Sequence, residues 1–163
     1  MKKTKVMFNK FSREIEVQVN TIKIDKVDEY VHLGQLVTMQ NDKTDKIKRR
    51  IVAGWITFNK NRNIMKSKLP MCLKRKICTQ CVLTAMTYGS QTWAITKRMQ
   101  ERLRIAQRSM ERAIVGTTRR DRKTNVWLRQ QTGVQDIVCR MKKLKWQWVG
   151  HIARTTDHRW TKD

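Results

Sequence analysis

The spacing of apolar residues changes near residue 41, and this change limits the possible folds more than any other feature. Before it, polar and apolar residues alternate in short runs, the clearest being residues 14–19, and a period of two is typical of half-buried strands. After it, apolar residues recur every three to four positions, the period of an amphipathic helix. The sequence therefore predicts an α+β protein with three or four short antiparallel strands within residues 4–37 and then a mostly helical bundle.

The predicted elements end at residues that favour such ends. Gly34 closes the last of the candidate strands, which are residues 5–8, 14–19, 21–24 and 27–33. Asn41 or Asp42 can cap a first helix, and Pro70 stands where a second would begin and end near residues 88–90. A third helix spans residues 96–115 before Gly116, a short one ends at residues 132–133, and a last one follows. The apolar stripes expected to face the core are Ile47, Ile51, Trp55, Phe58 and Met65; Leu73, Ile77, Cys81 and residues 82–86; Met99, Leu103, Ala106, Met110 and Ile114; and Ile137, Met141, Leu144, Trp148 and Ile152.

Composition bounds the class of protein. With six Gly and one Pro in 163 residues, neither a turn-rich β protein nor low-complexity disorder is favoured. The sequence has no apolar run of membrane-spanning length, and its basic start has no apolar stretch behind it. We therefore expect an intracellular protein, in the nucleus or the cytoplasm, that is neither secreted nor membrane-bound. We expect the four cysteines to be free, buried and not metal-binding, since the Cys78–Cys81 pair has no second ligand pair at a zinc-like spacing.

The chain is strongly basic, with 37 Lys and Arg against 13 Asp and Glu, a net charge of +24 and a pI near 10.7. Residues 46–100 contain thirteen Lys and Arg and no acid, and residues 97–129 contain eleven against three acids. A solvated surface usually mixes both signs, so contact with nucleic-acid phosphates is the preferred interpretation and a merely soluble basic surface the alternative. We expect the ligand to be an RNA–DNA hybrid or a structured RNA. The expected contact residues are Lys48, Arg49, Arg50, Arg62, Lys66, Lys74, Arg75, Lys76, Arg119, Arg120 and Arg122.

The tryptophans divide into two groups. Trp55 and Trp148 lie on apolar stripes and are expected in the core. Trp146 lies off the stripe beside Lys142 and Lys145, which makes it the better candidate for stacking on an unpaired base.

Specific strings resemble a known family. They are Lys3-Thr4-Lys5, Tyr30-Val31-His32-Leu33-Gly34, Tyr88-Gly89-Ser90-Gln91-Thr92-Trp93, Asp121-Arg122-Lys123-Thr124-Asn125 with Leu128-Arg129, and Trp148-Val149-Gly150-His151-Ile152-Ala153-Arg154 with Asp157 and Arg159-Trp160. In this order they resemble the region from the end of the palm onward in reverse transcriptases of non-LTR (LINE-type) retrotransposons. The RTE-like elements, whose single protein joins an endonuclease to the polymerase, are most similar. The sequence departs from the family pattern at His32, Gln91 and Val149, where Tyr, Glu and Ala are usual.

The resemblance implies three regions. Residues 1–40 would be the end of the palm, residues 41–116 a thumb-like helical bundle, and residues 117–163 the start of a basic helical region. The primer-grip-like segment would comprise Tyr30, His32, Leu33 and Gly34. Lys3 or Lys5 would be the palm lysine that protonates pyrophosphate; alternatively, both simply lie on a short strand.

The family's catalytic carboxylates have no counterpart here. They come from a palm motif and a Tyr-x-Asp-Asp turn ahead of the Lys-Thr-Lys string, and this sequence contains no Asp-Asp pair. We therefore expect this chain alone to be inactive and without a cofactor, while the parent polymerase would need Mg²⁺ and the palm and fingers as partners. Two alternatives remain open: a free-standing basic nucleic-acid-binding protein derived from such an element, and a relic without function.

Overall fold

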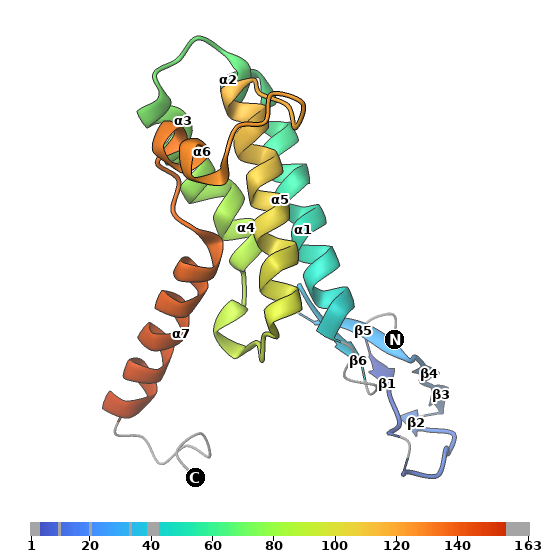
Figure 1. Cartoon of the computed structure of the whole chain (residues 1–163). Coiled ribbons are helices and arrows are strands. Elements are labelled where there is room, and N and C mark those ends of the chain that lie inside the picture. The colour runs from blue at the N-terminus through green and yellow to red at the C-terminus, as the bar shows by residue number, and fades with distance from the viewer. Residues whose placement is uncertain (1–3, 10, 20, 33, 39–42, 156–163) are drawn as a thin grey trace. The chain divides into compact units, whose positions relative to one another are not determined.

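The structure, a computed structural model, describes residues 4–9, 11–19, 21–32, 34–38 and 43–155. The chain divides into two compact units, Met1–Lys46 and Ile47–Asp163, which are described separately. Short strands come first and helices follow (Figure 1). The predicted α+β class is therefore confirmed.

The described residues of the first unit form three two-stranded ladders. Its strands are β1 (Lys5–Val6), β2 (Gln18–Val19), β3 (Ile22–Lys23), β4 (Asp25–Lys26), β5 (Glu29–His32) and β6 (Gln35–Thr38). The β2–β3 and β5–β6 pairs are antiparallel as expected, but β1 pairs with β4 in parallel. The intervening residues 7–24 are long enough to return the chain to the same direction, as a parallel connection requires.

Little apolar surface is buried among these strands. Leu36 is buried, whereas Ile15 is 62% and Phe11 96% exposed. The half-buried strand predicted over residues 14–19 is therefore wrong, because only Gln18–Val19 forms a ladder. Alternation is a signal of burial, but the apolar positions Ile15 and Val19 of this run are exposed.

Within residues 43–155, the described part of the helical region, there are nine helical segments. They are α1 (Lys43–Lys60), α2 (Arg62–Lys66), α3 (Met71–Ile77), the π-helical η1 (Cys78–Val82), α4 (Leu83–Thr87), the 3₁₀ turn η2 (Ser90–Thr92), α5 (Lys97–Val115), α6 (Asn125–Thr132) and α7 (Ile137–Arg154). Several predicted ends are confirmed. Gly116 and Gly133 adopt left-handed φ values of 79° and 60° at the ends of α5 and α6, and α3 begins directly after Pro70. The proposed caps Asn41 and Asp42 lie outside the described residues.

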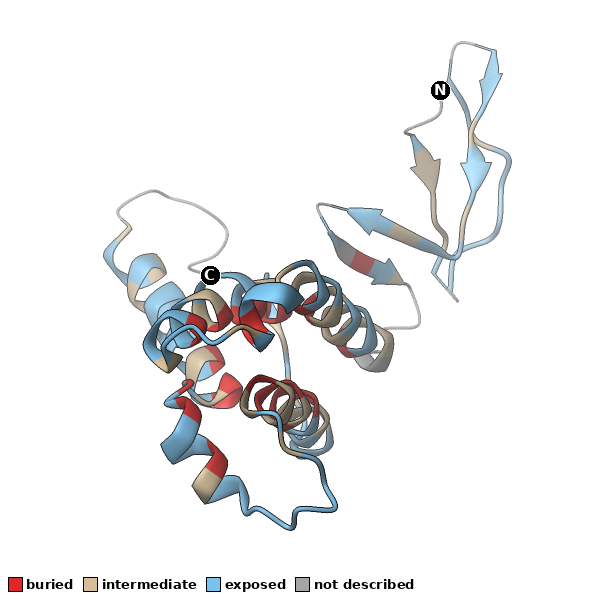
Figure 2. Cartoon of the chain, turned by 90° about the horizontal axis from the view of Figure 1, so that it is seen from above, coloured by how far each residue is buried: buried red, intermediate tan, exposed pale blue. Residues whose placement is uncertain are grey.

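The core of the second unit lies where α1, α4, α5 and the start of α7 meet (Figure 2). Gly54 permits the close approach of α1, because a Cβ there would lie 2.3 Å from Cγ of Met86. The predicted stripe of α5 is confirmed: four of its five residues are buried and Met99 packs against them. The buried core residues are Ile47, Phe58, Met65, Cys78, Val82, Leu83, Met86, Leu103, Ala106, Met110, Ile114, Val134, Ile137, Val138 and Met141.

The stripe predicted for the second helix is partly wrong. Leu73 is 45% exposed and Cys81 is exposed, whereas Val82, Leu83 and Met86 are buried as predicted and Ile77 packs against the core. Ahead of Val82 the buried positions are Lys74 and Cys78, one later than predicted, and the π turn inserts one residue before Leu83. Of the four thiols, only that of Cys78 is buried, so the expectation of burial is wrong for Cys72, Cys81 and Cys139.

The last helix is buried only near its start. Ile137, Val138 and Met141 are in the core, but Trp148 is 42% exposed, so its predicted burial is wrong. Trp55, by contrast, packs against the core as expected. Among the described helices, none combines the length and apolar content that a membrane crossing requires.

Candidate nucleic-acid interface

Asp136 is the centre of the junction between α5, α6 and α7. Its Oδ1 caps α7 by accepting hydrogen bonds from the backbone N–H groups of Val138 (2.9 Å) and Cys139 (3.3 Å). A capping carboxylate also interacts favourably with the positive end of the helix dipole. The position of this side chain is therefore fixed by the start of α7.

The second oxygen of Asp136 gathers three arginines from two other helices. Arg129 on α6 and Arg108 on α5 approach its Oδ2 at 2.7 and 3.2 Å, and Nε of Arg104 lies at 3.6 Å. Arg108 is only 5% exposed. The carboxylate thus compensates the buried charge of Arg108 and also pairs with two cations, Arg104 and Arg129, that remain partly exposed.

Two more buried polar residues of α5 complete the junction. Gln107 donates to the backbone carbonyl of Gln135 and accepts from the N–H of Ile137, both at 2.8 Å. Glu111 is fully buried and pairs with Arg108 at 2.5 Å. Burial raises the pKa of the Glu111 carboxyl, and Arg108 only partly opposes this shift. This side of the junction is held by a buried polar network rather than by apolar contact alone.

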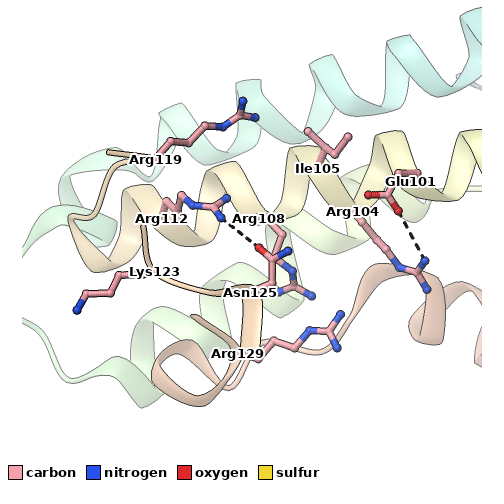
Figure 3. Close-up of a pocket in the computed structure, with 9 residues that line it drawn as sticks. All are labelled: Glu101, Arg104, Ile105, Arg108, Arg112, Arg119, Lys123, Asn125 and Arg129. Atoms are coloured by element: carbon pink, nitrogen blue, oxygen red, sulfur yellow. Dashed lines mark hydrogen bonds and ion pairs between the residues drawn. The ribbon is translucent and has the colours of Figure 1, made fainter. Parts of the chain in front are cut away.

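A cavity of about 450 Å³ lies beside this junction (Figure 3). Its walls come from α5, α6 and the loop between them, and they carry six cations and one carboxylate. The lining residues are Glu101, Arg104, Ile105, Arg108, Arg112, Arg119, Lys123, Asn125 and Arg129. Of these lining residues, the sequence predicted only Arg119 as a nucleic-acid contact.

The six cations have different partners. Arg104, Arg108 and Arg129 are held by carboxylates, as described above. Arg112 instead donates to the neutral side chain of Asn125 at 3.1 Å, and Lys123 lies 5.3 Å from the centre of the Trp127 ring. The exposed side chain of Arg119 makes no ion pair within the described part of the chain. The cavity therefore keeps a surplus of positive charge.

The loop that carries Arg119 and Lys123 has a fixed conformation. The carboxylate of Asp121 accepts from the backbone N–H of Thr118 at 2.6 Å and from its hydroxyl at 3.0 Å, which lowers the pKa of Asp121. Thr124 then caps α6 by accepting from the N–H of Trp127. The loop therefore has defined ends on both sides of its basic residues.

The string at residues 121–129 can now be interpreted in structural terms. Asp121 fixes the turn, Asn125 accepts from Arg112, Leu128 is fully buried, and Arg129 pairs with Asp136. Lys123, Asn125 and Arg129 of the string thus line the cavity, whereas Asp121 and Leu128 hold the loop and α6 in place.

The predicted contact residues of α1 and α2 are mostly accessible. Lys48, Arg49, Arg62 and Lys66 are exposed, whereas Arg50 is half-buried. The guanidinium of Arg50 lies 4.7 Å from the ring centre of Tyr88, the first residue of the string at 88–93. A cation over an aromatic face is held by the ring's electron density.

The three predicted contact residues of α3 differ in exposure. Lys74 is only 7% exposed, so we leave it out of the proposed surface. Arg75 and Lys76 are exposed, but Arg75 lies against the end of α6, where a Cβ on Gly133 would be 2.7 Å from Nη1. A cation near a helix C-terminus is favourable, so Arg75 also has a structural contact. Arg120 and Arg122 are exposed in the loop outside the cavity.

The primer-grip-like segment belongs to the first unit. Tyr30 and His32 on β5 stack with their ring centres 6.4 Å apart, and Gly34 has a left-handed φ of 77° between β5 and β6. Lys5 pairs with Asp25 at 2.5 Å, and this contact lowers the pKa of Asp25. Leu33 and Lys3 lie outside the described residues.

The chain is similar to a transposon-derived protein of the nematode Caenorhabditis elegans. The two are 36% identical over 167 residues, which cover 98% of this chain and 60% of the relative. The chain thus spans about three fifths of the length of this relative, and the similarity supports an origin in a transposon. No protein-family model matches the sequence, and no solved structure matches it significantly.

Proposed function

We propose that this chain is the part of a non-LTR retrotransposon reverse transcriptase that runs from the end of the palm through the thumb, and that it binds the template–primer duplex. The observation that carries the proposal is the stretch of residues 46–76, which holds eleven Lys and Arg and no acid. A run of like charge on this scale opposes folding through self-repulsion, and a polyanion relieves it. A phosphate backbone is the polyanion that a polymerase thumb contacts.

The proposed surface combines α1, α2, the exposed residues of α3 and the loop after α5. Such contacts give affinity without reading base sequence, because every phosphate presents the same charge. A polymerase that copies any template requires this property. The order of the family-like strings supports the parent element, and the transposon-derived relative supports an origin in a transposon.

A competition experiment tests the proposal. The chain is bound to a labelled RNA–DNA hybrid and challenged with unlabelled hybrid, duplex DNA or single-stranded RNA, followed by fluorescence anisotropy. If the chain acts as a polymerase thumb, the unlabelled hybrid should compete best. Equal competition by all three would favour a free-standing basic binding protein instead.

The relic hypothesis makes a different prediction. Short strands with little burial leave sheet edges open to pairing between copies. A relic would therefore aggregate on purification and bind no form of nucleic acid in a saturable manner, as light scattering and anisotropy would reveal.

A further inference from the structure

We infer that the cavity between α5, α6 and the loop at residues 117–124 binds one phosphate group of a nucleic acid. The inference rests on the proposed function and names the chemical group that one site in the basic surface receives. It concerns a site that the sequence did not predict, apart from Arg119.

The charge in and behind the cavity is unbalanced. Six cations line it, whereas the carboxylates available to them are Glu101 in the wall and Asp136 and Glu111 behind it. Three positive charges remain uncompensated among the described residues, and a phosphate group carries one or two negative charges. An anion of this size would therefore balance most of the surplus.

The geometry also suits a phosphate. Figure 3 shows the guanidinium group of Arg112 against the side chain of Asn125, and Arg108 and Arg129 line the same cavity. Guanidinium groups donate paired hydrogen bonds that match two oxygens of a phosphate. Asn125 is also the first residue of α6, so the positive end of that helix dipole adds to the attraction. The cavity volume leaves room for the attached sugar.

The fold does not account for all of these cations. Arg104, Arg108 and Arg129 hold Asp136 and thereby join three helices. Lys123 lies over the Trp127 ring, and Arg119 makes no ion pair among the described residues. A bound phosphate would give both exposed cations a negative partner.

Charge-matched variants test the inference. The cavity variant Arg119→Gln with Lys123→Gln removes two exposed cations from the rim. The control variant Lys97→Gln with Arg98→Gln removes two exposed cations from the first turn of α5, outside the cavity. Both should unfold at the same urea concentration as the wild type, since none of the four residues is buried.

Binding to a labelled RNA–DNA hybrid is then measured by anisotropy at several salt concentrations. We expect the cavity variant to bind about tenfold more weakly. The slope of log K against log salt concentration should become shallower by about 0.9, the value for one phosphate. The affinity of the control variant for the hybrid should fall by less than threefold. Equal losses in both variants, or no loss in the cavity variant, would overturn the inference.

Two forms of the hybrid distinguish the source of the phosphate. If the wild type prefers a hybrid with a 5′-phosphate over one with a 5′-hydroxyl, and the cavity variant loses this preference, the site takes a terminal phosphate. If the cavity variant loses affinity equally for both forms of the hybrid, the site takes a backbone phosphate.

A titration with inorganic pyrophosphate separates this inference from the proposed function. The readout is the Nε–Hε NMR resonance of Arg112, identified by its loss in Arg112→Lys. A saturable shift of this resonance without hybrid binding would support an anion site but contradict the proposed function. Hybrid binding without a saturable shift would support the proposed function and overturn the cavity site.

Discussion

The junction of α5, α6 and α7 and the outer face of α1 are both rich in cations, but these cations have different surroundings. At the junction, the nearly buried Arg108 contacts two carboxylates, those of Glu111 and Asp136. On α1, Arg49 is exposed and makes no ion pair within the described residues. The comparison teaches that a count of basic residues cannot tell structural cations from those available to a ligand. What separates them is the presence of a buried acid.

This difference leads to opposite expectations for substitutions. Removing a partner at the junction leaves a charge buried without compensation, which costs stability. Removing an exposed cation from α1 leaves the fold intact and costs binding. Four predictions test this division, from the largest expected effect to the smallest.

Asp136→Ala should have the largest effect. It removes the cap of α7 and the carboxylate that Arg108 and Arg129 share, so we expect a loss of about 3–5 kcal/mol in the free energy of unfolding. Urea denaturation followed by circular dichroism measures this loss. Asp121→Ala, which removes an exposed turn carboxylate, is the control and should lose much less. Similar losses in the two variants would contradict the structural role of the junction.

Arg49→Ala combined with Arg50→Ala should mainly affect binding. We expect weaker binding of an RNA–DNA hybrid and a salt slope flattened by up to about two. The loss of the Arg50–Tyr88 contact should cost only about 0.5–1 kcal/mol of stability. The control is Lys97→Ala with Arg98→Ala, which removes the same charge from the first turn of α5. An unchanged slope in the α1 variant would show that its face is not the contact surface.

Glu111→Gln should reveal the raised pKa of the buried carboxyl. Because this pKa is higher in the folded state, the wild-type group favours folding at low pH, and that contribution is lost as pH rises through the folded-state pKa. The stability of the variant relative to the wild type should therefore increase from pH 4 to pH 7. Denaturant titrations at intermediate pH values follow the change. A decrease over this range would mean that pairing with Arg108 outweighs burial.

The fourth prediction, which has the smallest expected effect, concerns chemical labelling of the cysteines. Burial raises the pKa of the Cys78 thiol to about 12, whereas Cys72, Cys81 and Cys139 are exposed. Only the thiolate reacts with iodoacetamide, so mass spectrometry should find Cys78 unmodified in the native protein and modified after unfolding. Rapid native labelling of Cys78 would contradict the described packing of the π turn.

The parts of the fold that depend on neighbouring residues could be predicted from the sequence. The stripe of α5 and the glycines that end α5 and α6 follow from spacing and backbone freedom alone. The π turn at Cys78–Val82 could not be predicted, because a register shift of one residue leaves no compositional signal. Trp148 fits the stripe of α7, but whether a stripe is covered depends on neighbours that periodicity does not reveal.

The candidate site was less accessible to sequence reasoning. Arg108 and Asp136 are 28 positions apart, and only the packing of α5 against α7 brings them together. The sequence did contain one usable signal: Glu111 is an acid beside the predicted apolar stripe of a basic helix. An acid retained there indicates a buried cationic partner.

The salt dependence of hybrid binding by the unmodified chain tests the central claim most directly. Exposed cations that neutralise at least six phosphates predict that log K falls with log salt concentration at a slope of about −5 or steeper. Anisotropy titrations between low and moderate salt measure this slope. A steep slope supports a phosphate-binding surface, whereas an affinity that barely changes with salt would contradict it.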